Sequence, residues 1–393
     1  MYDYTIVGGG IVGLSVGMAL TKKYPGKKIL VLEKEQELAS HQTGHNSGVI
    51  HSGIYYKPGS YKARFAKQGS QSMVEFCQKH DIAYDNCGKV IVATNEQERP
   101  LLENLYQRGL ENGLSIKRLN KEELLEVEPH VNGVEAIFVS ATGIVDYKMV
   151  SNKYAEIIKD HDGDIHCGEE VNQIAELPDG VTVETNKQTY QTKFLINCAG
   201  LQSDRIAKLA GYHIDMKIVS FRGEYFKLKP EKRHLVRNLI YPVPNPEFPF
   251  LGVHFTREIN GEVEAGPNAV LGFKREGYKK TDINVKDLAE VLGYKGFLRL
   301  ARKYMKVGMG EMVRSVSKKK FVESLQQLIP EIRSEDLVAA PAGVRAQALN
   351  SDGTLVDDFQ IIQGKKSLHV CNAPSPAATA SIEIGKEIVR RIG

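Results

Sequence analysis

The sequence is poor in three things: patterned cysteine, long hydrophobic runs and an excess of one charge. Its 393 residues include only five cysteines, at positions whose spacing matches no metal site. An odd, unpatterned set is typical of a reducing compartment, where buried thiols act as small hydrophobic side chains. We therefore expect neither a disulfide framework nor a bound metal. The five are Cys77, Cys87, Cys167, Cys198 and Cys371.

No stretch of the chain is long and apolar enough to span a bilayer. The first predicted strand starts within the first few residues, so we expect no signal peptide before it. The formal net charge of +4 is small for this length and does not by itself indicate a nucleic-acid partner. We expect a cytoplasmic globular protein that is long enough for two domains and does not bind nucleic acid.

A dinucleotide-binding fingerprint occupies residues 3–33. An apolar strand at 4–7 runs into Gly8-Gly9-Gly10-Ile11-Val12-Gly13, a helix is expected at 14–20, and a second strand at 29–32 ends on Glu33. Gly8 permits the tight turn, Gly10 lets the backbone approach a pyrophosphate, and Gly13 lets the helix pack on the strand. Glu33 can accept hydrogen bonds from the ribose hydroxyls of an adenosine, and its charge disfavours the 2′-phosphate of NADP.

The same strand–turn–helix pattern returns later in the chain. A strand at 194–197 precedes a small-residue turn, Asn197-Cys198-Ala199-Gly200, and a helix at 203–209. A strand at 368–372 precedes a final helix expected from about Ala377. Further helices are expected at 60–80, 96–112 and 147–159. The β-formers of residues 218–272 predict an antiparallel sheet, and residues 283–329 look helical and basic.

These patterns predict an α/β fold with an α+β substrate part. The Rossmann-like cofactor domain is expected to be discontinuous, comprising residues 1–88, 141–217 and 335–393. An antiparallel-sheet substrate domain takes residues 89–140 and 218–334, including the basic helical segment at about 283–329.

Several longer strings resemble one enzyme family. The fingerprint, the 197–200 turn and the C-terminal strand–helix joint resemble FAD-dependent proteins of the D-amino-acid oxidase (glycine/sarcosine oxidase-like) superfamily. More specific strings resemble the L-2-hydroxyglutarate dehydrogenase/oxidase family within it. They lie at residues 51–56 (HSGIYY), 221–225 (FRGEY), 241–244 (YPVP), 252–257 (GVHFTR), 266–270 (GPNAV), 342–347 (AGVRAQ) and 372–379 (NAPSPAAT).

The resemblance implies FAD, held non-covalently, and oxidation of L-2-hydroxyglutarate to 2-oxoglutarate by hydride transfer to flavin N5. Electrons would then pass to quinone or oxygen. From the fingerprint and the resemblance together, we expect the cofactor to contact Gly8, Gly10, Ile11, Val12, Gly13, Glu33, Lys34, Thr43, Asn46, Ser47, Gly48, Val171, Ala199, Gly200, Gly343, Ala377, Ala378 and Thr379.

Oxidation of a 2-hydroxy acid needs a proton acceptor, and histidine is the usual one near neutral pH. His51 and His254 are the two candidates. We favour His51 as the base and His254 as a polarising or carboxylate-binding group. A structural role for either histidine is the alternative.

Arg345 is the expected anchor for the substrate carboxylate, because a guanidinium can bind a carboxylate through two parallel hydrogen bonds. A surface ion pair is the alternative for this residue. The second carboxylate of a diacid needs another cation or hydroxyl groups. The candidates are Tyr55, Lys57, Arg222, Tyr241 and Arg257.

Residues 274–320 are strongly basic, with 14 Lys/Arg against 5 Asp/Glu, a net +9. This segment could contact anionic lipid on the inner face of the cell membrane, near a quinone. The alternative is a solvated basic helix pair that covers the substrate domain.

Three other functions compete with the one implied by the resemblance. They are an FAD amine or amino-acid oxidase of the same fold, a non-catalytic flavin-binding protein, and an NAD-dependent Rossmann enzyme.

Overall fold

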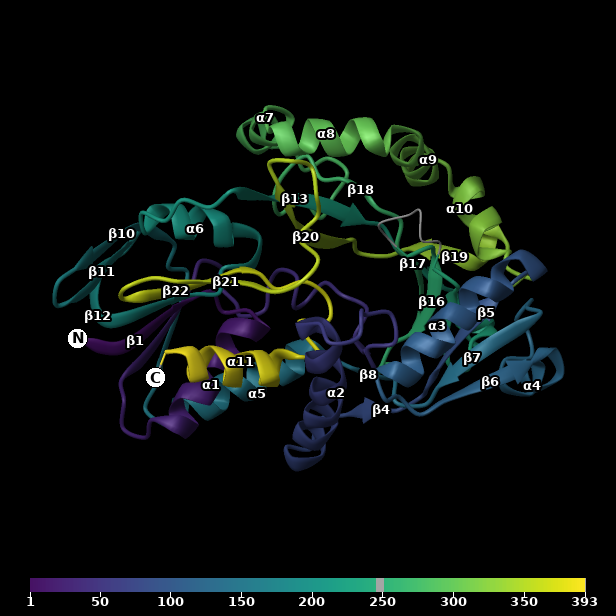
Figure 1. Ribbon diagram of the computed structural model, residues 1–393, viewed down its shortest axis with the longest axis horizontal. Helices are drawn as coiled ribbons and strands as arrows, with labels where there is room; N and C mark the ends of the chain where they lie inside the picture. Colours follow the sequence, from purple (N-terminus) through teal and green to yellow (C-terminus); the bar gives the residue numbers. More distant parts are fainter. Residues whose placement is uncertain (245–250, 393) are drawn as a thin grey trace.

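The computed structural model describes residues 1–244 and 251–392. Two large sheets lie at opposite ends of the molecule, and a small sheet bridges them at the top in Figure 1. Both chain termini lie beside the first sheet. Chain segments far apart in sequence build every one of these sheets, which brings the fingerprint and the later motifs together.

The first sheet contains the fingerprint strand. Its parallel core runs β22-β12-β1-β2-β9, and antiparallel strands β10, β11 and β21 extend it. Strand β12 pairs with β1 and β22 along its apolar second half. The bounds are β1 (Tyr2–Val7), β2 (Ile29–Glu33), β9 (Asp164–Cys167), β10 (Val171–Leu177), β11 (Gly180–Thr185), β12 (Thr189–Asn197), β21 (Gln360–Gln363) and β22 (Ser367–Asn372).

Helices cover both faces of this sheet, as a buried parallel sheet requires. Helices α1 (Ile11–Lys23), α5 (Tyr147–Lys159) and α11 (Ser381–Arg391) pack together below it in Figure 1, and α2 (Tyr61–Lys79) packs on α11. Helix α6 (Ser203–Leu209) lies on the other face. Ile6, Leu14 and Ile388 have no exposed surface in the core between them.

The second large sheet has the order β19-β14-β17-β16-β15-β5-β7-β6. All neighbours are antiparallel except β15, which runs parallel to β5. Helices α3 (Arg99–Glu111), α4 (Lys121–Val127) and α10 (Lys318–Leu325) pack on it. The strands are β5 (Lys89–Ala93), β6 (Ile116–Asn120), β7 (Glu135–Val139), β14 (Phe226–Leu228), β15 (Leu239–Pro242), β16 (His254–Arg257), β17 (Val263–Gly266) and β19 (Leu337–Ala339).

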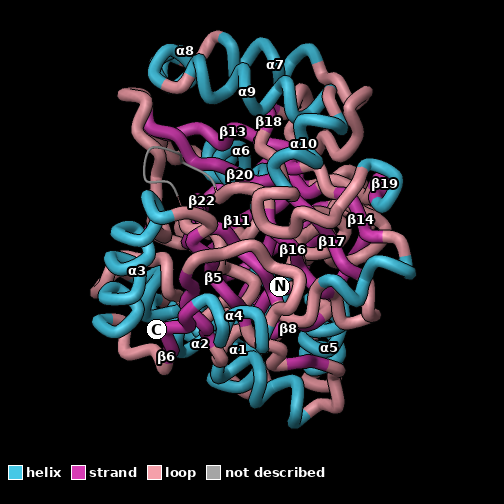
Figure 2. Tube along the Cα trace, turned by 90° about the vertical axis from the view of Figure 1, so that its right-hand side faces the viewer, coloured by secondary structure: helices cyan, strands magenta, loops and turns pink. Residues whose placement is uncertain are grey.

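The bridging sheet consists of β13 (Met216–Gly223) between β18 (Val270–Leu271) and β20 (Gly343–Asn350). Helices α7 (Val285–Leu292), α8 (Lys295–Lys303) and α9 (Met305–Val316) lie across it, at the top of the molecule in Figure 2. A short sheet, β3 (Val49–Ile50), β8 (Gly143–Val145) and β4 (Tyr84–Asp85), supports the chain just before His51.

The predicted fold class is confirmed, and two local predictions are wrong. Helices α5 and α6 have the expected bounds, and α7–α10 lie within the segment expected to be helical. The last helix begins at Ser381, not near Ala377, because the Ala377 and Ala380 amides bond to Pro374 and Pro376 in turns that precede it.

Residues 218–272 do not form one sheet. Strands β13 and β18 join β20, whereas β14–β17 join strands from residues 89–139. Local pattern cannot show this division, because one partner of each strand lies more than 100 residues away: β20 for β13 and β5 for β15. The domain boundaries themselves stay a prediction, and β19 pairs with β14 although it falls inside the segment assigned to the cofactor.

Candidate active site

A single large cavity contains most of the predicted site. It has a volume of about 1760 Å³ and runs from the fingerprint, past the loop at residues 39–47, to the region where the two large sheets meet. A pocket for one drug-sized ligand has roughly 300–1,000 Å³. The cavity therefore has space for a dinucleotide and a small substrate together.

The glycine turn between β1 and α1 forms one wall of the cavity. Gly8 has a φ of 114°, and a Cβ there would lie 2.5 Å from the carbonyl oxygen of Cys198 at the end of β12. A Cβ on Gly13 would lie 2.0 Å from the Gly8 carbonyl oxygen. Both positions therefore exclude any side chain, and the amino end of α1 can approach a phosphate closely.

Glu33 and Thr43 hold this turn in place. Glu33 is buried, and its carboxylate accepts the Gly9 amide at 2.7 Å and the Glu35 amide at 2.9 Å. The Thr43 hydroxyl accepts the Ile11 amide at 3.0 Å and so ties the polar loop to the start of α1. Each Glu33 oxygen keeps a lone pair for a ribose hydroxyl, as the fingerprint predicts.

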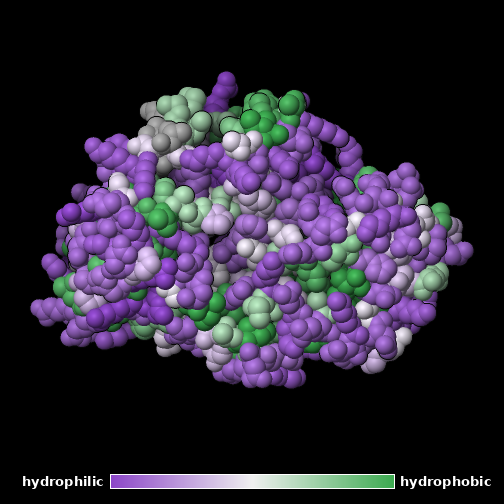
Figure 3. All heavy atoms as spheres, turned by 180° about the vertical axis from the view of Figure 1, so that it is seen from behind, coloured by the Kyte–Doolittle hydropathy of each residue, from purple (hydrophilic) through white to green (hydrophobic). Residues whose placement is uncertain are grey.

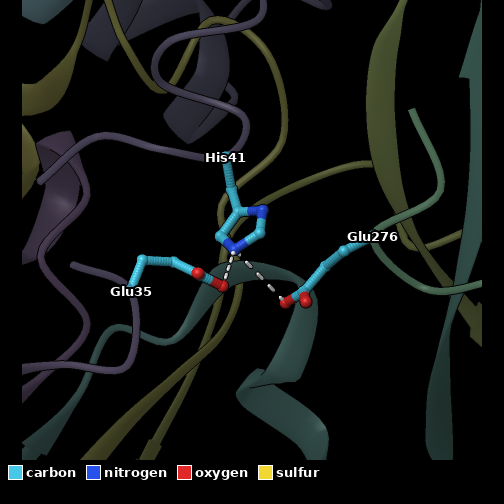
Figure 4. Close-up of side chains that lie close together, drawn as sticks. All are labelled: Glu35, His41 and Glu276. Carbon is cyan, nitrogen blue, oxygen red and sulfur yellow. Dashed lines mark hydrogen bonds and ion pairs between the residues drawn. The ribbon is translucent and has the colours of Figure 1, made fainter. Parts of the chain in front are cut away.

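Next to this end lies a cluster of Glu35, His41 and Glu276, shown in Figure 4. Its oxygens and imidazole nitrogen could hold a metal ion by spacing, but the Lys34 ammonium already sits among them. Lys34 Nζ lies 3.0 Å from both His41 Nε2 and Glu276 Oε2, and it also pairs with Glu35. The bonds to the two glutamates raise the pKa of Lys34, and its bond to Glu35 lowers the pKa of that carboxyl. The pKa of Glu276 is lowered first by a hydrogen bond from Gln202 and then by His41 and Lys34. The cluster is an ion-pair network with lysine as its cation.

The C-terminal turn braces the substrate end. Thr379 Oγ1 accepts the His51 amide at 3.1 Å, lies 2.8 Å from the Tyr147 hydroxyl and donates to the Val49 carbonyl at 3.2 Å. Thr379 therefore fixes the chain that presents His51.

Of the 18 residues expected to contact the cofactor, only Gly13 and Gly48 do not line the cavity. Gly13 packs beneath the turn, and the Gly48 amide bonds to Asn46 Oδ1 at 2.8 Å within the loop.

Arg345, His51 and His254 meet at the far end of the cavity. The accessible surface of the Arg345 side chain faces the cavity. Protein surrounds this side chain on its other sides, and this burial lowers the pKa of the guanidinium. Burial, followed by the nearby cations Lys89 and Arg345, lowers the pKa of His51 to about 3 and that of His254 to about 4. The ring of His254 stacks on that of Tyr241, with centroids 3.9 Å apart. Because both pKa values lie well below 7, both imidazoles are neutral at pH 7.

The hydrogen bonds define the tautomer of His254. Its Nδ1 lies 2.9 Å from the Gly252 carbonyl oxygen, which can only accept, so Nδ1 carries the proton. The other ring nitrogen, Nε2, is then left as an acceptor.

Three residues considered for the second carboxylate do not line the cavity. Arg222 donates to the Lys279 carbonyl at 2.9 Å and pairs with Glu224 at 3.0 Å. Arg257 donates to the Arg237 carbonyl at 2.7 Å and lies 3.6 Å from Asp85. Lys57 is exposed. Arg222 and Arg257 are thus occupied by other partners and Lys57 lies on the surface, whereas Tyr55 and Tyr241 line the cavity.

Sequence reasoning missed several residues at this end. Tyr56 and Tyr225 line the cavity near Arg345, and burial raises the pKa of Tyr56 to about 12. Lys89 lies behind Tyr55 and Tyr241. Tyr56 stands inside the HSGIYY string, but Lys89, the first residue of β5, carries no local signal of a site.

The residues present fit FAD. The side-chain-free turn at Gly8 provides a place for a pyrophosphate, Glu33 can bind a ribose, and the cavity continues to a region large enough for the flavin ring. A family model described as FAD dependent oxidoreductase matches residues 3–391. The chain belongs to this family of FAD-dependent oxidoreductases, and FAD is its cofactor.

Within that class, the chain is similar to L-2-hydroxyglutarate dehydrogenases. It is 52% identical to the enzyme of Indibacter alkaliphilus over 98% of this chain and 97% of that one. It is 46% identical to the enzyme of Escherichia coli strain K12, over 100% of this chain and 93% of that one. A solved L-alpha-glycerophosphate oxidase from Mycoplasma pneumoniae, with FAD bound, shares the fold, with a TM-score of 0.81 and 24% identity over 99% and 94% of the two chains.

Proposed function

We propose that this protein oxidises L-2-hydroxyglutarate to 2-oxoglutarate. The observation that carries the proposal is the cluster of one enclosed arginine and two neutral histidines at the end of an FAD-sized cavity. The names of the similar enzymes support this substrate.

In the proposed reaction, a hydride leaves the α-carbon and a proton leaves its hydroxyl group. Bound FAD supplies the hydride acceptor, at N5 of its ring. Arg345 binds the neighbouring carboxylate through its guanidinium and so fixes the α-carbon.

For the proton, the His254 tautomer suggests the reverse of the roles that the sequence favoured. His254 Nε2 has a lone pair and no proton, so we propose that it accepts the hydroxyl proton. His51, held by Thr379, would then hold the substrate oxygen. A neutral imidazole is needed for the first of these roles, and the low pKa of His254 keeps it neutral.

The predicted division of the chain into a cofactor domain and a substrate domain is part of the proposal. Residues 1–88, 141–217 and 335–393 would bind FAD, and residues 89–140 and 218–334 would contribute the substrate side.

The test is anaerobic mixing of the purified holoenzyme with L-2-hydroxyglutarate while the visible flavin band is followed. We expect rapid bleaching with the L enantiomer and none with the D enantiomer. No bleaching with either would overturn the proposed substrate, and bleaching by amino acids or N-methyl amines instead would favour the amine oxidase alternative. Admitting oxygen or a quinone to the reduced enzyme then identifies which of the two accepts electrons.

We also propose a peripheral contact between helices α7–α9 and an anionic membrane. No helix in the described ranges combines the length and apolar character needed to cross a bilayer. The side chains of Val285, Leu292, Leu298, Met305 and Met309 are nevertheless 48–79% exposed. Figure 3 shows hydrophobic atoms gathered at this edge of the molecule.

Exposed basic residues, including Lys295, Arg302 and Lys303, lie among these apolar side chains. This combination suits an interface of anionic lipid headgroups and acyl chains. Flotation with phosphatidylglycerol vesicles should recover the protein at low salt, and Leu298→Gln should reduce recovery. Leu177→Gln, which changes a leucine of similar exposure on β10, is the matched control. Equal recovery with purely zwitterionic vesicles would contradict the proposal.

A further inference from the structure

Lys89 is a buried cation in an apolar strand. It begins β5, its exposed fraction is 1%, and the next four residues of the strand have none. In the sheet it stands opposite Val139 and Leu239. A charged group in such surroundings is unfavourable unless a partner compensates it.

The immediate neighbours of the Lys89 ammonium are two aromatic rings. Its Nζ lies 4.5 Å from the ring centroid of Tyr55 and 4.9 Å from that of Tyr241. Such cation–π contacts are favourable but do not replace a counter-ion. No carboxylate among residues 1–244 and 251–392 forms an ion pair with Lys89, and burial lowers its pKa to about 7.

Tyr55 provides a second, independent observation. Its hydroxyl oxygen is buried and has no hydrogen-bond partner in the described part of the chain, although the residue lines the cavity. A buried hydroxyl without a partner loses the hydrogen bonds that water would give it. An acceptor from a bound molecule would restore them.

Lys89 and Arg345 act on the same pair of histidines. Both cations contribute to the low pKa values of His51 and of His254. The reacting end of the cavity therefore has two cations, of which Arg345 faces the cavity directly and Lys89 stands behind the rings of Tyr55 and Tyr241.

We propose that the Tyr55 hydroxyl binds the second carboxylate of a diacid, that the Lys89 ammonium stabilises the charge of this carboxylate from behind the rings of Tyr55 and Tyr241, and that Arg345 binds the first carboxylate. This subsite rests on the proposed function and makes it more specific, because it selects dicarboxylates over monocarboxylates. Arg222, Lys57 and Arg257, the cations that the sequence offered for this role, lie elsewhere. A carboxylate at this position would give Lys89 its counter-ion and Tyr55 its acceptor.

The experiment measures binding of non-reactive acids to the holoenzyme through perturbation of the flavin spectrum. The probes are glutarate, which has two carboxylates, and butyrate, which has one. We expect wild type to bind glutarate more tightly. In Lys89→Met the affinity for glutarate should fall by about 30-fold or more, which is the lower end of the affinity loss seen when one partner of a buried charge pair is truncated. The affinity for butyrate should change little. Lys89→Arg should recover part of the preference, and Tyr55→Phe should lose a smaller part.

Thermal unfolding separates this role from a structural one. Methionine is similar in length and uncharged, so Lys89→Met should unfold at the same or a higher temperature than wild type. A variant that loses both acids equally, or a wild type that does not prefer glutarate, would overturn the subsite. If glutarate binds as expected but L-2-hydroxyglutarate does not bleach the flavin, the subsite stands and the proposed oxidation fails.

Discussion

At the scale of single residues, Arg345 combines access to the cavity with enclosure by protein. Removing such a cation leaves the substrate carboxylate without its main partner. We expect Arg345→Ala to reduce kcat/KM for L-2-hydroxyglutarate by about 30-fold to several thousand-fold. This corresponds to about 2–5 kcal/mol, the range for truncating one partner of a buried charge pair. Arg345→Lys should retain part of the activity, because it keeps the charge but loses the bidentate geometry.

Arg257→Ala is the matched control for this prediction. Arg257 belongs to one of the family-like strings, yet it bonds to Asp85 and to the Arg237 carbonyl outside the cavity. Its kinetics should be close to those of wild type. Steady-state assays over a range of substrate concentrations make the comparison, and equal losses in both variants would refute the role given to Arg345.

The neutral histidines predict how stability depends on pH. In the unfolded chain an imidazole has a pKa near 6.5, whereas folding lowers that of His254 to about 4. Between these values the unfolded state binds more protons, so the stabilisation from neutral His254 is present above pH 6.5 and is lost as pH falls. Between pH 7 and pH 5 we expect a loss of about 2 kcal/mol from this residue.

Urea unfolding of wild type and of His254→Asn at the two pH values checks this expectation. The variant lacks the titrating group and should lose less stability than wild type over that interval. The low pKa also predicts that kcat/KM stays level below pH 6.5. An acid limb centred near 6.5 would show that the essential base is an ordinary exposed imidazole.

Among the helices, strands and turns, the turn between β1 and α1 forms the pyrophosphate site with backbone atoms and no side chains. A Cβ at Gly13 would collide with the Gly8 carbonyl oxygen at 2.0 Å, and the contact is with backbone, which cannot rotate away. We expect Gly13→Ala to be purified with much less FAD than wild type, and to unfold at a lower temperature even with FAD added.

Gly310→Ala in α9 is the control, since a Cβ there would meet nothing within 4 Å. Alanine favours helix over glycine by about 1 kcal/mol, so this variant should be as stable as wild type or more stable. The ratio of flavin absorbance to protein absorbance gives cofactor content. Full FAD content in Gly13→Ala would contradict the close packing described for this turn.

Elements with strong local patterns were predicted well. Helix α5 begins at an Asp146 cap and has an apolar face with Val150, Tyr154 and Ile158, so its bounds follow from residues within one segment. The start of α11 was misplaced, because the prolines at 374 and 376 look like a helix start and instead belong to turns. Whether these prolines start a helix or belong to turns depends on the path that residues 373–380 take to the cavity wall.

At the scale of the whole molecule, a buried ion pair joins the sheets. Arg275 donates from Nη2 to Asp204 Oδ2 at 2.9 Å and from Nη1 to the Leu201 carbonyl at 2.9 Å. Asp204, in α6, also accepts the amide of Ile218 in β13, and the Arg275 amide bonds to Asp287 in α7. One pair thus connects the first sheet, the bridging sheet and the helices above it.

Breaking this pair should destabilise the whole protein. Arg275 and Asp204 are 4% and 7% exposed, so Arg275→Met leaves a buried carboxylate without its counter-ion and should reduce the free energy of unfolding by about 3–5 kcal/mol. Arg118→Met, which removes a more exposed pair with Glu103 and Glu135, should reduce it by at most about 1 kcal/mol. Denaturant unfolding of the two holoenzymes makes the comparison, and similar losses would show that burial does not matter here.

The cofactor end of the site could be predicted from local sequence patterns. A strand, a glycine turn, a helix and an acid at fixed spacing are neighbours along the chain, so their geometry follows from local backbone chemistry. The class of fold and the family resemblance also followed from such strings.

The substrate end of the site depends on contacts that form only in the folded chain. Arg222 and Arg257 looked as suitable as any other cation, but strands β13 and β16 direct them to partners outside the cavity. Lys89 gave no local signal, and pairing of β5 with β15 placed it against Tyr241 and Tyr55. Whether a charge meets solvent, a counter-ion or a buried cavity depends on contacts between residues far apart in sequence, which no local pattern encodes.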